Sequence, residues 1–351
     1  MENWMNTPIE NSDVVLSSRI RLARNISNMP FPHKLSQDKG RELVKIVEDA
    51  LFSDKDIGDK FKSIHLWEND PITNKTYFEK HLISYNLLNN KETGAVILNK
   101  DETISIMINE EDHIRIQCIT AGMNLSEAYN IANNIDDILE KKLNYAFNED
   151  LGYITACPTN IGTGLRASVM IHLPVITITN EMSGVLNALT QVGMTIRGQY
   201  GEGSKTKGNI YQVSNQVTLG LSEQEILSNL KAVALQLITQ ENISRQNVMT
   251  NYKYEFDDKI YRSFGVLKSA VLIDLAECLN LLSDVRLGME MGMIKNVDKK
   301  VLNSLLVDVQ PGRLQILFGK KLTDKDRNFQ RAKLIREKLN LNVQIKDGGE
   351  V

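Results

Sequence analysis

Residues 103–118 read T-I-S-I-M-I-N-E-E-D-H-I-R-I-Q-C. Isoleucine occupies every second position up to Ile108, and the alternation of apolar and polar residues resumes at Ile114. A period of two is typical of a β-strand that buries one face. The segment therefore predicts two strands joined by an acidic connection at residues 109–112.

A third strand is predicted at residues 166–173, R-A-S-V-M-I-H-L. Its apolar side begins at Ala167 and recurs at alternate residues, and Pro174 ends the run because proline cannot continue a strand ladder. The side chain of Arg166 is then expected to face away from the apolar side.

The chain after Leu221 has helical periodicity almost throughout. Ser222 and Glu225 have the spacing of a capping box, which predicts the start of a long helix. A mixed α+β domain is therefore followed by a helical one, with a join near residues 245 to 255. The division that we predict is an N-terminal extension at 1–13, a mixed domain at 14–245 and a helical domain at 246–351.

The composition is that of an ordinary soluble globular protein, with 351 residues, 42% hydrophobic and 24% charged. A net charge of -3 offers no basic field for nucleic acid or anionic lipid. No apolar run approaches the ~18 residues that cross a bilayer, and the start of the chain does not resemble a signal peptide. Cys118, Cys157 and Cys278 are too far apart for a disulfide frame or a zinc site, so we expect a cytoplasmic protein.

The common nucleotide-binding motifs do not apply. No GxxxxGK[ST] string occurs, which excludes a P-loop. Residues 162–167 match GxGxxA, with Glu181 at a suitable distance, but a dinucleotide site needs a helix to follow the glycines. The pattern there is a strand, so a dinucleotide site is not expected.

Five arginines lie at or near predicted strand ends, and they are Arg19, Arg21, Arg115, Arg166 and Arg197. In an extended segment Arg19 and Arg21 project from one face, roughly 6 to 7 Å apart. Together the five could converge on a phosphate chain, because arginine stays ionised and meets phosphate oxygens bidentately. For any single segment the alternative is a surface charge beside a solvated turn.

The segments around these arginines resemble the phosphagen (guanidino) kinases, and most closely the bacterial protein-arginine kinases of the McsB family. The strings are SSRIRLARN (17–25), NEEDHIRIQ (109–117), CPTNIGTGLRASV (157–169) and RGQYGEG (197–203). The motif-bearing resemblance runs from about Val14 to Glu241. It implies an α+β fold, with an antiparallel-sheet catalytic domain flanked by helices and a helical C-terminal domain.

The resemblance also implies site residues. The ATP phosphates are expected to contact the five arginines and their neighbours, namely Ser17, Ser18, Arg19, Ile20, Arg21, Arg115, Arg166, Ala167, Ser168, Val169, Met170, Arg197, Gly198, Gln199, Tyr200 and Gly201. Glu111 and Glu202 are expected to hold the substrate guanidinium. His81 matches a nucleotide-binding histidine, although by itself it would be an ordinary surface histidine. Cys157 is expected to contact the guanidine, with a buried small hydrophobe as the alternative.

Guanidine is a poor nucleophile, because the pKa of its conjugate acid is about 12.5 to 13.8. A carboxylate must orient it and accept a proton, and we assign the base to Glu111 and the second clamp to Glu202. Mg²⁺ is expected to bind the ATP phosphates, with no protein ligand named.

The acceptor is predicted to be an arginine of a protein. Metabolic guanidino kinases carry a helical domain ahead of the SSRIR-type motif, whereas only sixteen residues precede Ser17 here, so we expect an open acceptor site. In the helical domain Arg327 and Arg331 are four residues apart. They resemble an RDxxRA motif that binds phosphoarginine, although Asn328 replaces its acidic residue. The alternative is an ordinary basic helix face.

The predicted function is thus an ATP-dependent protein-arginine kinase. The family implies that phosphoarginine marks proteins for the Clp protease and inactivates a heat-shock transcriptional repressor, with a zinc-binding activator, McsA, and a homodimer. Direct contact with nucleic acid or a membrane is not expected. Two alternatives stay open: a kinase for a small guanidino metabolite such as arginine, and a non-catalytic phosphoarginine-binding adaptor.

Overall fold

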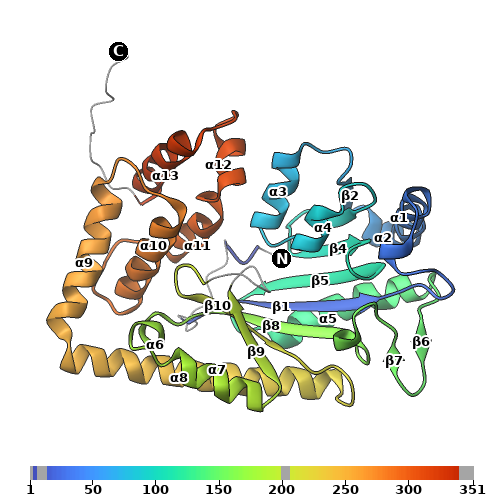
Figure 1. The fold of residues 1–351 in the computed structure, drawn as a ribbon, viewed down its shortest axis with the longest axis horizontal. Helices are drawn as coiled ribbons and strands as arrows, with labels where there is room; N and C mark the ends of the chain where they lie inside the picture. Colours follow the sequence, from blue (N-terminus) through green and yellow to red (C-terminus); the bar gives the residue numbers. More distant parts are fainter. Residues whose placement is uncertain (1–2, 6–13, 199–205, 340–351) are drawn as a thin grey trace.

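The computed structural model describes residues 3–5, 14–198 and 206–339. An α+β region built on one large sheet and a set of C-terminal helices lie side by side (Figure 1). The strands are β1 (Val15–Arg24), β2 (Phe61–His65), β3 (Ala95–Asn99), β4 (Ile104–Ile108), β5 (Ile114–Ala121), β6 (Phe147–Asn148), β7 (Gly152–Tyr153), β8 (Leu165–His172), β9 (Met194–Gly198) and β10 (Ile210–Asn215).

Helices surround the sheet and form the C-terminal region. They are α1 (Gln37–Phe52), α2 (Lys55–Gly58), α3 (Pro71–Glu79), α4 (Tyr85–Asn89), α5 (Leu125–Glu140), α6 (Pro174–Ile178), α7 (Met182–Gln191), α8 (Glu223–Asn251), α9 (Lys253–Ser269), α10 (Leu275–Glu290), α11 (Lys299–Asp308), α12 (Pro311–Leu317) and α13 (Asp324–Lys338), with short 3₁₀ turns η1 (Pro32–Lys34) and η2 (Pro158–Asn160).

The sheet is antiparallel throughout its eight strands, in the order β2-β3-β4-β5-β1-β8-β10-β9. The predicted hairpin is confirmed, because β4 pairs with β5 in register Ile108 to Ile114. The strand predicted at 166–173 is β8, which pairs with β1 on one side and β10 on the other. The predicted α+β class with an antiparallel sheet is therefore confirmed.

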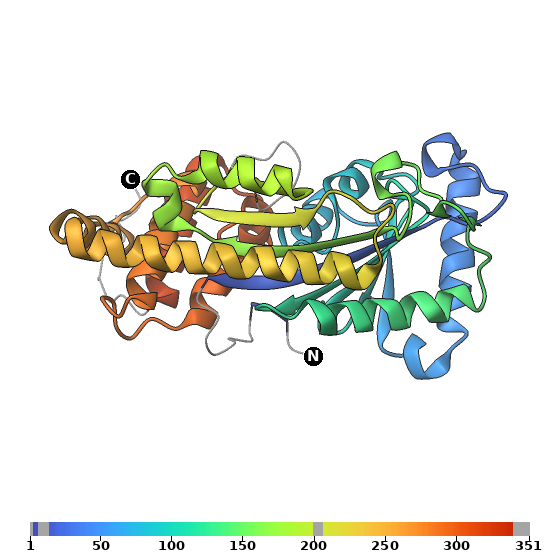
Figure 2. The ribbon, with the colours of Figure 1, turned by 90° about the horizontal axis from the view of Figure 1, so that it is seen from below.

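The two faces of the sheet have opposite chemistry. On one face Ile20 and Leu22 are at most 1% exposed and belong to a large apolar cluster. Helices α1, α5 and α8 contribute to that cluster, and Figure 2 shows α5 and α8 running across this face. The intervening residues Arg19 and Arg21 point to the other face, because successive side chains of a strand alternate.

Helix α8 begins at the predicted capping box, in which the Ser222 hydroxyl accepts from the Glu225 amide and the Glu225 carboxylate accepts from Ser222 N–H. It continues for 29 residues to Asn251, so it passes the predicted domain boundary at 245 and ends within the range of 245 to 255 predicted for the join. The division of the chain at that point stays a prediction.

The C-terminal helices share a second apolar cluster with one end of the sheet, where Leu16, Ile119 and Met170 contribute. Polar contacts also join the two regions. The buried Glu79 carboxylate, at the end of α3, accepts from the Gly312 and Arg313 amides of α12 at 2.8 and 2.7 Å. No helix in the described ranges is both long and apolar enough to cross a membrane.

The apolar face should carry much of the stability. Replacing Ile20 by alanine leaves a cavity in a closely packed site and should lower the free energy of unfolding by about 2 to 5 kcal/mol. Chemical denaturation measures this loss. The matched control is Ile243→Ala on α8, where the side chain is 54% exposed and the change should stay within about 0.5 kcal/mol. Equal losses in the two variants would contradict the assignment of faces.

Candidate active site

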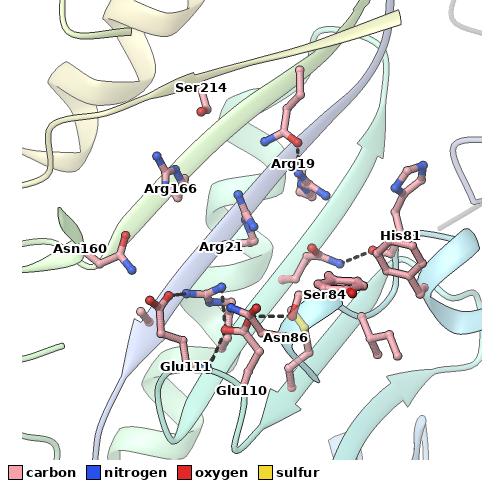
Figure 3. A pocket seen from close by; sticks show the side chains of 18 of the residues that line it. Arg19, Arg21, His81, Ser84, Asn86, Glu110, Glu111, Asn160, Arg166 and Ser214 are labelled. Carbon is pink, nitrogen blue, oxygen red and sulfur yellow. Dashed lines mark hydrogen bonds and ion pairs between the residues drawn. The ribbon is translucent and has the colours of Figure 1, made fainter. Parts of the chain in front are cut away.

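Five arginines from four strands meet at one hollow on the polar face of the sheet. Arg21 of β1 lies directly opposite Arg166 of β8, and Arg115 of β5 lies opposite Ala23 of β1. A pocket of about 360 Å³ is lined by Arg19, Arg21, Arg115, Arg166 and Arg197 together with Glu110 and Glu111 (Figure 3). The structure therefore brings together all five of the predicted arginines.

The guanidinium groups of Arg19 and Arg21 are buried close to other cations, which costs electrostatic free energy. Burial, followed by repulsion from Arg115 and Arg166, lowers the pKa of Arg19 to about 10. Burial and the charges of Arg19, Arg115 and Arg166 lower the pKa of Arg21 well below its usual value. The buried Nε of Arg21 has no hydrogen-bond partner among the described residues. A polyanion would stabilise these crowded cations, and it could also accept a hydrogen bond from Arg21 Nε.

The two carboxylates among the described residues that line the pocket, Glu110 and Glu111, both bind Arg115. Arg115 binds Glu110 at 2.7 Å through Nη1 and Glu111 at 3.0 Å through Nη2. Burial would lower the pKa of Arg115, but Glu110, Asp112 and Glu111 outweigh it and raise the pKa. The Glu111 side chain is 33% exposed, whereas that of Glu110 is 1% exposed. Glu111 is thus the carboxylate that an incoming cation can reach.

Glu110 is held more firmly than its neighbour. Its carboxylate accepts from the Ser84 hydroxyl at 2.5 Å and from the Glu111 amide at 2.9 Å. Burial would raise the pKa of Glu110, but Arg115 and these hydrogen bonds lower it overall. Glu110 therefore remains a carboxylate that positions Arg115 next to Glu111.

His81 lies at the other end of the pocket, directly after α3 (Figure 3). It is only 8% exposed, so the alternative of an ordinary surface histidine is wrong. Burial and the charge of Arg19 lower the pKa of His81 to about 3, which keeps the ring neutral. Its backbone has φ of 63°, and its carbonyl accepts from the Gln117 side chain at 2.8 Å.

Several residues that the sequence assigned to phosphate contact have side chains elsewhere. Ile20, Ala167 and Val169 lie in the apolar core, because their strands turn alternate residues to the other face. The Ser18 hydroxyl donates to the Gly122 carbonyl at 2.8 Å, on that same side. These four side chains face away from the pocket, so the prediction is corrected for a contact through the side chains, and a phosphate contact through the main chain stays a prediction.

The remaining residues that were predicted to contact phosphate lie beside the pocket, farther along the sheet, or outside the described residues. Ser168 bonds Arg19 Nε at 3.4 Å beside the pocket, while Ser17 and Met170 lie farther along the face next to Trp4. Gly198 is buried at the end of β9 and pairs with Tyr211. The others lie outside the described residues, and they are Gln199, Tyr200, Gly201 and Glu202.

Cys157 stands just before η2 and is half-buried, which excludes the alternative of a fully buried hydrophobe. Its sulfur lies 3.0 Å from the Thr159 hydroxyl. The nearby Asn160 lines the arginine pocket. A contact of Cys157 with a guanidine stays a prediction.

Some pocket residues were given no role by the sequence. Gln212 accepts from Arg19 Nη2 at 2.5 Å, and Ser214 lies two residues farther along the same strand. The alternation of β10 could have revealed this pair. Ser84 and Asn86 come from the loop before α4 and its first turn, where no periodic pattern points to them.

The predicted phosphoarginine residues lie far along the chain, on α13. Arg331 is 2% exposed, and it donates to the Val309 and Ile273 carbonyls at 2.9 Å and to the Asn328 side chain at 2.7 Å. Arg327 binds Asp324 and the Leu322 carbonyl. An ordinary solvated basic face is therefore wrong for Arg331, and Asn328 helps to hold it. Phosphoarginine binding stays a prediction.

The donor set for a metal ion is sparse. Within the part of the chain that the structure describes, no three His, Cys, Asp or Glu side chains are grouped to hold one.

Comparison with known proteins agrees with this geometry. Residues 42–244 match the family described as ATP:guanido phosphotransferase, C-terminal catalytic domain. Residues 253–348 match the protein-arginine kinase McsB C-terminal domain. Among solved structures, lombricine kinase is similar with a TM-score of 0.58 and 26% identity, over 68% of this chain and 69% of that one.

Curated relatives match over nearly the whole chain. The protein-arginine kinase of Clostridium kluyveri is 60% identical over 98% of this chain and 100% of its own length. That of Geobacillus stearothermophilus is 46% identical over 99% of this chain and 96% of its own length. The chain therefore belongs to the ATP:guanido phosphotransferases and, among them, to the protein-arginine kinase family.

Proposed function

We propose that this protein transfers the γ-phosphoryl group of ATP to the guanidino nitrogen of arginine residues in proteins. The observation that carries the proposal is the convergence of five arginines on one hollow beside Glu111. The curated relatives named protein-arginine kinase support the choice of a protein acceptor over a small metabolite.

The arginine row suits the triphosphate. Phosphoryl transfer depends on in-line alignment and on neutralising the charge of the moving group. Arg19, Arg21 and Arg166 lie along neighbouring strands and point into one space (Figure 3). A bound triphosphate would relieve the repulsion among them, so binding and alignment use the same charges. Mg²⁺ is proposed to bind through the phosphates and to add positive charge there.

Glu111 is proposed to receive the acceptor. Its carboxylate lies 3.0 Å from Arg115 Nη2 and remains one-third exposed, so it borders both the phosphate site and solvent. It can bind the acceptor guanidinium and take its proton as nitrogen attacks phosphorus. Glu202 and Cys157 are proposed as further contacts of the guanidinium.

The wider biology rests on the family resemblance. We propose protein substrates that include a heat-shock transcriptional repressor, delivery of tagged proteins to the Clp protease, and the zinc-binding activator McsA. A homodimer and allosteric binding of phosphoarginine at Arg327 and Arg331 belong to the same proposal. The three free cysteines support a cytoplasmic location, since a reducing compartment keeps thiols free.

Loss of the proposed base should abolish most of the activity. Glu111→Gln keeps the shape but cannot accept a proton, so the phosphorylation rate of an arginine-rich unfolded protein should fall at least ~10² to 10⁴-fold. Acid-labile phosphate, scored by mass spectrometry after incubation with Mg-ATP, measures the rate. Glu140→Gln on the exposed side of α5 is the matched control. Label that resists acid, or an unchanged rate in Glu111→Gln, would reject the mechanism.

Loss of the Arg21 side chain should lower the phosphorylation rate without lowering the free energy of unfolding. Arg21→Met removes a crowded cation, so the rate should fall about 10³ to 10⁵-fold, by analogy with arginine fingers, while the free energy of unfolding stays equal or rises. Arg24→Met is the matched control on the same strand. Arg24 binds Asp136 at 2.6 Å and stacks on Tyr153, so its loss should destabilise the fold by about 3 to 5 kcal/mol. Denaturation curves that show equal destabilisation would contradict this reading.

A further inference from the structure

A second hollow opens on the other side of Glu111. This groove, of about 710 Å³, has roughly twice the volume of the arginine pocket. One wall comes from η1 and the first residue of α1, Gln37, and the other from the end of α4 at Asn89 and the loop that follows. Glu110 and Glu111 line both hollows. The groove thus leads directly to the proposed acceptor carboxylate.

The walls of the groove are fixed to the same short connection that carries Glu111. Asn109, with φ of 58°, donates to the Gly40 carbonyl at 2.8 Å and to the Thr93 carbonyl at 2.9 Å. These bonds tie α1 and the loop after α4 to the connection. The wall at Asn89 is therefore held at a fixed position relative to the Glu111 carboxylate.

The opposite wall is fixed by His113. Its Nδ1 accepts from the Ile26 amide at 3.0 Å, so its Nε2 carries the hydrogen and donates to the Pro30 carbonyl at 2.8 Å. Burial lowers the pKa of His113, which favours this neutral form. The segment that leads into η1 is thereby held at a set position beside Glu111.

The third side of the groove is held in place by Asp112. Its Oδ1 accepts from the Ala156 amide and from the Asn25 side chain, both at 2.7 Å. Ala156 lines the groove and directly precedes Cys157. Asn109, Asp112 and His113, which lie on either side of Glu111 in the chain, thus hold the separate segments that wall the groove, and this makes the groove a preorganised surface.

The exposed polar groups of the groove are better suited to bind the main chain of a polypeptide than to recognise one particular side chain. Gln37 and Asn89 are exposed primary amides, each able to donate and accept as a peptide group requires. Lys91 and Glu92 carry opposite charges at adjacent positions, and the other two carboxylates of the lining, Glu110 and Glu111, are bound to Arg115. Such a surface binds extended backbone with little demand on sequence.

We infer that this groove binds the main chain of the acceptor polypeptide in an extended form, while its arginine side chain reaches Glu111. The inference rests on the proposed function and deepens it. A free guanidino compound would use Glu111 but would leave the groove empty. The occupant is thus an unfolded or locally extended protein segment, not a small metabolite.

The test compares two acceptors in the full-length enzyme. One is N-acetyl-arginine methylamide, and the other is a longer peptide with a central arginine flanked by glycine and serine. In the double variant Gln37→Ala/Asn89→Ala, kcat/KM for the peptide should fall about tenfold, as expected for the loss of one or two hydrogen bonds. The kcat/KM for N-acetyl-arginine methylamide and the KM for ATP should not change.

A second variant and a control keep the result decisive. Asn89→Trp fills the groove and should also lower kcat/KM for the peptide alone. Asn134→Ala removes an exposed amide on α5, across the sheet, and should change neither acceptor. Thermal melting checks that each variant is folded.

The outcomes separate the two proposals. If the wild-type enzyme phosphorylates both acceptors and the groove variants treat them alike, the groove inference is overturned and the kinase remains. If the wild-type enzyme phosphorylates neither acceptor, the proposed function fails and the inference fails with it. A selective loss for the peptide in both groove variants supports the inference.

Discussion

Repulsion among like charges on one face of the sheet is the constraint on which the site depends. Five guanidinium groups line one pocket, while the described lining includes only two carboxylates, both bound to Arg115. Such an arrangement costs free energy in the unliganded protein. The opposite face supplies compensation, because β1 and β8 bury Ile20 and Val169 there against α5 and α8. One strand thus carries core residues and pocket-lining arginines at alternate positions.

This alternation explains how much of the structure the sequence could predict. The period of two identified β4, β5 and β8, and it placed Arg166 on the face away from the apolar side. The same period also limits a motif-based assignment. In the contiguous string SSRIR, Ile20 lies between two arginines that line the pocket. The side chain of Ile20 nevertheless points into the core and has no part in the pocket.

Long-range contacts from aperiodic segments could not be predicted. Ser84 reaches Glu110 from a distant loop, and Asn109 bonds to carbonyls of two other segments. Nothing in local spacing indicates which carbonyl a side chain will meet. Arg331 illustrates the same limit, because its helical spacing indicates a face shared with Arg327, whereas the fold buries it against two backbone carbonyls.

The β4–β5 connection brings these contacts together. Glu110 fixes Arg115, Asp112 fixes the segment before Cys157, and His113 fixes the segment that leads to η1. Glu111 is the member of the connection left one-third exposed. A carboxylate whose neighbours are all committed to structure needs little reorganisation when a cation arrives, and preorganisation of this kind strengthens electrostatic catalysis. The acidic run is therefore a scaffold for one accessible carboxylate, which explains why four adjacent polar residues occur where a simple turn would suffice.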